Sequence, residues 1–101
     1  MMVIKEEQKE QIINCGVFDY SAQKLSNILD FDKTEIKIEL KNKNSELNKL
    51  LKKGKDLADY VIDLKLFNMA KTGDIKALEK LNARKSNRKR IRDEKKERSK
   101  L

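Results

Sequence analysis

The sequence predicts an all-α fold, with an N-terminal helix-turn-helix, a long helical hairpin and a basic C-terminal tail that is helical or disordered. Three observations favour this fold. The 101 residues include no proline and only three glycines, so few positions interrupt a helix. Apolar residues recur at spacings of three and four along most of the chain. Strand-like alternation occurs only over residues 35–40, which fit a helix better. We expect the three parts to span residues 1–44, 45–83 and 84–101.

The first two helices are predicted from their ends. The first runs from about Val3 to Cys15, with Gly16 as a left-handed cap. The second runs from Ala22 to Leu29, because Ser21 is a favourable N-cap. The residues that we expect this second helix to bury are Ala22, Leu25, Ile28 and Leu29.

The third helix is predicted from Lys33 to about Lys41, since Asp32 followed by Glu35 forms a capping box. Ile36 and Leu40 make its apolar stripe, with Ile38 to one side. Two short helices with an exposed basic second helix indicate a helix-turn-helix that binds duplex DNA. The residues that would face DNA are Lys33, Thr34, Lys37, Lys41 and Lys43. The alternative is an ordinary three-helix packing in which these lysines are merely solvated.

A helix over residues 46–71 follows Ser45 and would be about 39 Å long. Thr72, Gly73 and Asp74 then predict a stop and a restart, so that the next helix returns along it. The apolar face around Leu57–Phe67 is wider than one returning helix covers, which indicates self-association. The residues that would carry it are Leu57, Val61, Leu64, Phe67, Ile75, Leu78 and Leu81. The alternative is that they form an intramolecular core only.

The positive charge is concentrated in the tail. The whole chain carries a net charge of +8, and residues 84–101 hold 10 basic against 3 acidic residues, or +7. Such a tail predicts salt-dependent, sequence-independent affinity for nucleic acid. The candidate contacts are Arg84, Lys85, Arg88, Lys89, Arg90 and Arg92. An acidic protein partner is the alternative, and an anionic membrane surface is a weaker one because the tail lacks an apolar face. Arg90 is spaced to pair with Asp93 or Glu94, and Glu94 with Arg98.

Catalysis, cofactors and a membrane partner are not expected. The chain has no histidine, and its single cysteine, Cys15, permits neither an intramolecular disulfide nor a cysteine-based zinc site. No apolar run approaches the roughly 20 residues that span a bilayer. We therefore expect a soluble protein of the reducing cytoplasm without enzymatic activity.

Two motifs that bind ligands in other proteins are incomplete here. Gly54-Lys55-Asp56 lacks the upstream glycine and the final Ser or Thr of a phosphate-binding loop. The sequence after Asp30-Phe31-Asp32 lacks the glycine and the last acid of a calcium loop. Asp56, Asp59 and Asp63 share a helix face, but we expect them to pair with Lys52, Lys55 or a neighbour's lysines rather than with a metal ion.

Three short segments carry a family resemblance: residues 21–29 with 32–35, Lys53-Gly54-Lys55 leading into residues 58–64, and residues 66–78 with the corner Ala70-Lys71-Thr72-Gly73-Asp74. In their order, over roughly residues 12–83, the chain resembles the small terminase subunits of tailed bacteriophages. The resemblance implies a non-enzymatic DNA-recognition factor that forms a ring through its hairpin. It also implies that Lys33, Thr34, Lys37 and Lys41 face DNA at the packaging-initiation site, and that the helices of residues 57–67 and 75–81 carry oligomerisation.

The family further implies two partners besides DNA: other copies of the chain, and the large terminase subunit, which a C-terminal segment engages. The location would then be the cytoplasm of a bacterial host. Two alternatives stay open. One is a small helix-turn-helix transcriptional regulator, and the other is a structural or adaptor component of the virion whose basic tail contacts nucleic acid or an acidic partner.

Overall fold

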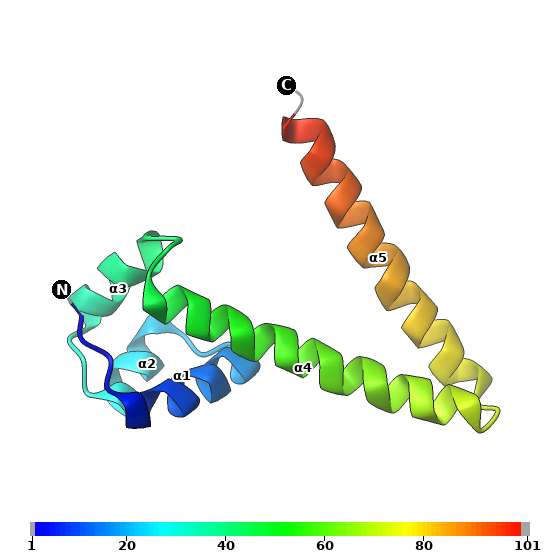
Figure 1. Ribbon diagram of the computed structural model, residues 1–101, viewed down its shortest axis with the longest axis horizontal. Helices are drawn as coiled ribbons and strands as arrows, with labels where there is room; N and C mark the ends of the chain where they lie inside the picture. The colour runs from blue at the N-terminus through cyan, green and yellow to red at the C-terminus, as the bar shows by residue number, and fades with distance from the viewer. Residues whose placement is uncertain (1, 100–101) are drawn as a thin grey trace. The chain divides into compact units, whose positions relative to one another are not determined.

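The computed structural model describes the backbone of residues 2–99 and the side chains of residues 2–96, and this part of the chain contains five helices and no strand (Figure 1). The prediction of an all-α fold is confirmed. Residues up to Tyr60 form one compact unit, and residues from Val61 onward form a second. The helices are α1 (Glu6–Phe18), α2 (Ala22–Leu29), α3 (Lys33–Lys41), α4 (Glu46–Lys71) and α5 (Ile75–Ser99).

Helices α2 and α3 begin and end where the sequence predicts, and a side chain caps the N-terminus of each. The Lys24 N–H donates to Ser21 Oγ at 3.4 Å, and the Thr34 N–H donates to Asp32 Oδ1 at 3.4 Å. Asp30 ends α2 in the left-handed conformation, with a φ of 61°. The short turn that follows brings α2 and α3 into contact with each other (Figure 1).

The predicted bounds of the first helix are wrong. Helix α1 starts at Glu6, where Gln8 Oε1 accepts the Lys5 N–H at 3.0 Å. It continues through Gly16 to Phe18, and Asp19 takes the left-handed conformation with a φ of 55°. Gly16 is therefore not the cap. It lies inside α1 and is buried by a contact with another helix.

That contact is a close crossing of α1 and α4 at Gly16 and Gly54. A Cβ atom added at Gly16 would lie 2.8 Å from the carbonyl carbon of Leu51. A Cβ atom added at Gly54 would overlap the Ile13 carbonyl oxygen and lie 2.9 Å from the Val17 nitrogen. Both glycines are buried, and at both the neighbouring atoms are backbone. The two helices approach so closely because neither residue has a side chain.

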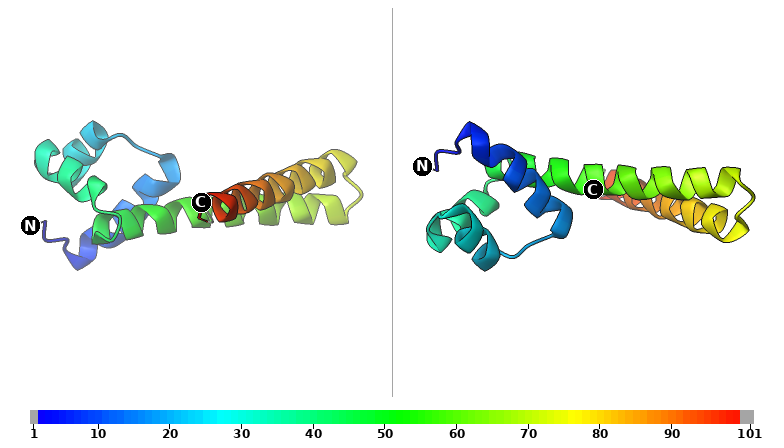
Figure 2. Two further views of the ribbon diagram at one scale, coloured as in Figure 1. Left: turned by 90° about the horizontal axis from the view of Figure 1, so that it is seen from above. Right: turned by 90° about the horizontal axis from the view of Figure 1, so that it is seen from below.

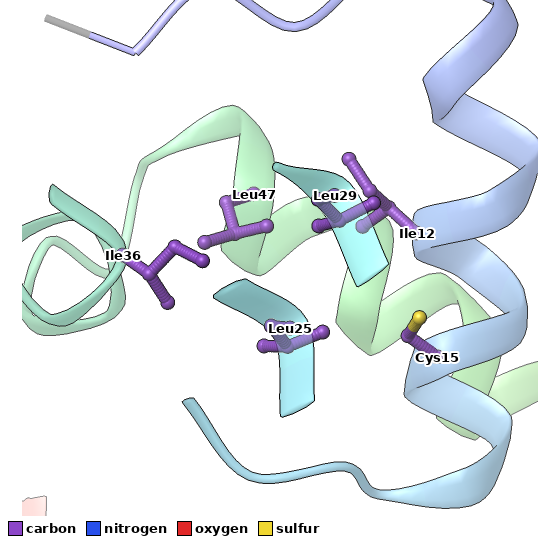
Figure 3. Packing of buried hydrophobic residues seen from close by; sticks show 6 residues of the cluster. All are labelled: Ile12, Cys15, Leu25, Leu29, Ile36 and Leu47. Carbon is purple, nitrogen blue, oxygen red and sulfur yellow. The ribbon is translucent and has the colours of Figure 1, made fainter. Parts of the chain in front are cut away.

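All four helices of the first unit contribute to its core (Figure 3), which consists of Ile12 and Cys15 of α1, Leu25 and Leu29 of α2, Ile36 of α3 and Leu47 of α4. Burial raises the pKa of the Cys15 thiol. Ile28, which we expected to be buried, is 40% exposed. Because Leu47 packs in this core, the start of α4 belongs with α1–α3, whereas the predicted division falls between residues 44 and 45.

Hydrogen bonds between side chains and backbone fix the connection from α3 to α4. Ser45 Oγ donates to the Glu39 carbonyl at 2.9 Å and accepts the Asn48 N–H at 3.1 Å. Asn48 Nδ2 donates to the carbonyls of Leu40 at 2.9 Å and Asn42 at 2.7 Å. These bonds satisfy carbonyls at the end of α3 that have no partner within the helix. They attach α3 directly to the first turn of α4.

The predicted stop and restart at residues 72–74 is confirmed, because α4 ends at Lys71 and α5 starts at Ile75, and the chain turns back between them (Figures 1 and 2). Gly73 has a φ of 98°, and Asp74 Oδ1 accepts the Ala77 N–H at 3.0 Å. Between residues 61 and 96, Ala77 is the only residue that is buried. None of the helices described within residues 2–99 is long and apolar enough to cross a membrane.

Candidate nucleic-acid interface

One exposed face of α3 combines positive charge with an apolar centre. Thr34, Lys37, Ile38 and Lys41 are spaced i, i+3, i+4 and i+7, so they share one side of the helix over about 10 Å. All four are exposed. We call these four residues the α3 face. Ile36 is fully buried in the core, which orients the α3 face toward solvent.

Lysine side chains, and not the helix N-terminus, are the groups of α3 that attract an anion. At the start, the Asp32 carboxylate accepts the Thr34 N–H, so a negative charge already occupies the helix N-terminus. Attraction for phosphate must therefore come from Lys33, Lys37 and Lys41, all of which are exposed. Lys43, the fifth predicted contact, is exposed in the connection that follows α3.

Sequence reasoning missed Ile38 as part of this surface. It was expected to lie to one side of the apolar stripe, yet its side chain is 62% exposed between the positions of Thr34 and Lys41. The available signal was its spacing of four from Thr34 and three from Lys41.

Arg84 and Arg88 of α5 form ion pairs with Asp63 of α4. Arg84 Nε donates to Asp63 Oδ1, and Arg88 Nη1 contacts Asp63 Oδ2, both at 2.7 Å. The hydrogen bonds from Arg88 and Arg84 hold the pKa of the Asp63 carboxyl below its usual value. Lysine partners were expected for Asp63, and for this residue that expectation is wrong, because α5 brings two arginines to it.

Five other basic residues of α5 fall on two different faces. Arg90 Nη2 donates to Asn87 Oδ1 at 2.8 Å, and Arg90 Nη1 lies 3.4 Å from Glu94 Oε1 as predicted. The predicted pair of Glu94 with Arg98 lies outside the described side chains. A separate face carries basic residues at i, i+4, i+7 and i+11, which span about 16 Å. This basic stripe consists of Lys85, Lys89, Arg92 and Lys96, all exposed.

Most of the predicted oligomerisation residues are exposed. The exposed fractions reach 61% at Val61, 48% at Phe67 and 71% at Ile75. Leu57, Leu64 and Leu78 are between 43% and 46% exposed, and Leu81 is partly buried. Within the second unit, a shallow groove on α4 is lined by Val61, Leu64, Lys65, Asn68, Met69 and Thr72.

Among the residues that the structure describes, no three Cys, Asp or Glu side chains are arranged to hold a metal ion. Lys55, which we expected to pair with the aspartates of its own helix, lies 3.2 Å from Asp19 Oδ1 instead. The chain matches no protein-family model, no curated protein and no solved structure. Its function is therefore inferred from α3, α5 and the hairpin themselves.

Proposed function

We propose that the protein is a non-enzymatic factor that binds duplex DNA through α3, and that it acts as a small terminase subunit which delivers viral DNA to a separate packaging motor. The observation that supports DNA binding is the α3 face: one exposed side of a capped helix, with lysines beside a polar and an apolar residue. A helix of this kind fits the major groove of B-DNA, which is about 12 Å wide.

The chemistry divides between two basic elements. Lys33, Lys37 and Lys41 contact phosphates beside the groove and position α3 against the base edges. The basic stripe of α5 adds contacts to phosphates that carry no sequence information. Arg84 and Arg88 are engaged in ion pairs with Asp63. We therefore assign Lys85, Lys89 and Arg92 of the tail to DNA.

The hairpin carries self-association. Eight large apolar side chains of the second unit are at least 39% exposed, whereas Ala77 is its one buried residue among those described. A surface this apolar in so small a unit is typical of an interface. The resemblance to small terminase subunits makes a ring of copies the assembly that we propose, and the large terminase subunit the further partner.

The test is a titration of labelled duplex DNA at graded salt, followed by fluorescence anisotropy. We expect the logarithm of the affinity to fall linearly with the logarithm of salt concentration, with a slope of about 0.9 for each phosphate contacted. Replacing Lys85, Lys89 and Arg92 with alanine lowers that slope by up to about 3 and leaves any sequence preference intact. Lys33→Ala with Lys37→Ala reduces the preference itself.

The control is Lys76→Ala with Lys80→Ala, two exposed lysines of α5 outside the basic stripe. For each charge removed, this pair should change the slope far less than the stripe variant does. Absence of binding at low salt, or an affinity that does not respond to salt, would rule out the proposal. If the control and stripe variants changed the salt slope equally for each charge removed, the basic stripe would have no special role in binding DNA.

A further inference from the structure

Ile38 is exposed without a structural reason within its own unit. Its side chain is 62% exposed, while Ile36, two residues earlier, is fully buried. Ile38 is also the one apolar residue among the exposed positions of α3, which otherwise carry charged or hydroxyl side chains. Isoleucine is only a moderate helix former, so helix stability does not favour it at an exposed site over the residues beside it.

Its surroundings indicate what kind of surface covers it. Lys37 and Lys41 share the α3 face with Ile38, and Lys33 is exposed at the start of the helix. An apolar protein partner that covered Ile38 would have to desolvate these ammonium groups, which is costly without acidic partners. Duplex DNA neutralises the lysines with phosphates at the groove edges and offers one apolar group on its major-groove floor, the thymine 5-methyl.

We infer that Ile38 is a specificity-determining residue that reads thymine by packing against its 5-methyl group. This inference rests on the proposed binding of DNA through α3. Thr34 lies one helical turn earlier, about 6 Å along the axis, and its hydroxyl and methyl face the same groove. Lys37 and Lys41 hold the helix against the phosphate backbone of the DNA, and Ile38 distinguishes one base pair from another.

The experiment starts from the duplex that the full chain selects from a random pool. Each thymine of that duplex is then replaced with deoxyuridine, which removes the methyl group and keeps the pairing. We expect the loss of one methyl group to weaken binding about fourfold at one or two positions, the factor that corresponds to about 0.8 kcal/mol for a buried group of this size. Ile38→Ala should weaken binding to the thymine duplex by at least the same factor and should no longer distinguish thymine from deoxyuridine there.

Three controls separate the possible outcomes. Ile28→Ala changes the same residue type at a 40% exposed site on α2 and should keep the distinction. Lys37→Ala alone, with Lys33 and Lys41 still present to position α3 on the backbone, should weaken binding to both duplexes by the same factor. Ile38→Val retains a branched apolar group and should keep part of the distinction, while circular dichroism checks that each variant has the helix content of the native chain.

The inference is overturned if Ile38→Ala still distinguishes the two duplexes, or if no deoxyuridine weakens binding by the native chain. It is also overturned if Ile38→Ala changes the oligomeric mass without DNA, because Ile38 would then lie in a protein interface. In each of these cases the chain still binds DNA, so the proposed function stands. Absence of DNA binding at low salt removes both.

Discussion

The crossing of α1 and α4 makes Gly54→Ala the sharpest test of the fold. In an exposed helix this change would stabilise the protein by about 1 kcal/mol, because alanine is the better helix former. Here the added Cβ atom overlaps the Ile13 carbonyl oxygen and lies 2.9 Å from the Val17 nitrogen. Both obstacles are backbone atoms, so no side-chain rotation relieves them and the helices must separate.

Overpacking of this kind typically costs about 1–3 kcal/mol, and rigid backbone on the far side places Gly54 at the upper end. After the gain in helix propensity is subtracted, we expect a net loss of about 2 kcal/mol in the free energy of unfolding. For a unit of this size the midpoint of thermal unfolding then falls by about 8–16 °C. Gly16→Ala should act in the same direction, since its Cβ atom meets the backbone of Leu51.

The assay is urea unfolding followed by circular dichroism. Lys53→Ala, at the exposed neighbouring position of α4, is the control and should change the free energy of unfolding by less than about 0.5 kcal/mol. If Gly54→Ala were as stable as the native chain, or more stable, the close approach of α1 and α4 at this point would be refuted.

Two further predictions concern the hairpin. Asp63→Asn should lower its stability by about 1 kcal/mol at pH 7, because two guanidinium groups lose their shared carboxylate, which is 24% exposed. The folded chain holds the pKa of Asp63 below its ordinary value of 3.8. The stabilisation is therefore present above pH 3.8 and is lost as the pH falls through the lowered pKa. The urea midpoints measured at pH 7 and at pH 3 should differ less in Asp63→Asn than in the native chain. Val61→Glu with Phe67→Glu should lower the oligomeric mass measured by sedimentation, whereas Asn82→Glu on the same unit should not. A native chain that stays monomeric at high concentration contradicts self-association, and a dimer instead of a larger ring would favour a transcriptional regulator.

The helix boundaries could be predicted wherever a local interaction determines them. Ser21 and Asp32 cap α2 and α3 through amides two or three residues away, and Gly73 with Asp74 sets the hairpin turn in the same way. Gly16 shows where this reasoning ends. Locally a glycine near a helix end predicts a cap, but its partner is Leu51, 35 positions further along the chain, and nothing near Gly16 in the sequence shows that contact.

The candidate site was predictable to a similar extent. Spacing alone places Thr34, Lys37 and Lys41 on one side of α3, and the structure shows all of them exposed. The spacing does not show which basic residues of the tail pair with acids of another helix. Arg84 and Arg88 meet Asp63 of another helix, so rules for neighbours within one helix do not reveal the contact.

The hydrogen bonds that join α3 to α4 have a consequence for the kinetics of the DNA binding that we propose. Ser45 and Asn48 hold the carbonyls of Glu39, Leu40 and Asn42, so the end of α3 is already ordered in the free chain. The proposed binding of DNA through α3 would then require no prior folding of that helix, and little conformational entropy would be lost on entering the groove. Association is then set by diffusion and electrostatic steering, and discrimination between sequences resides in how long each complex lasts.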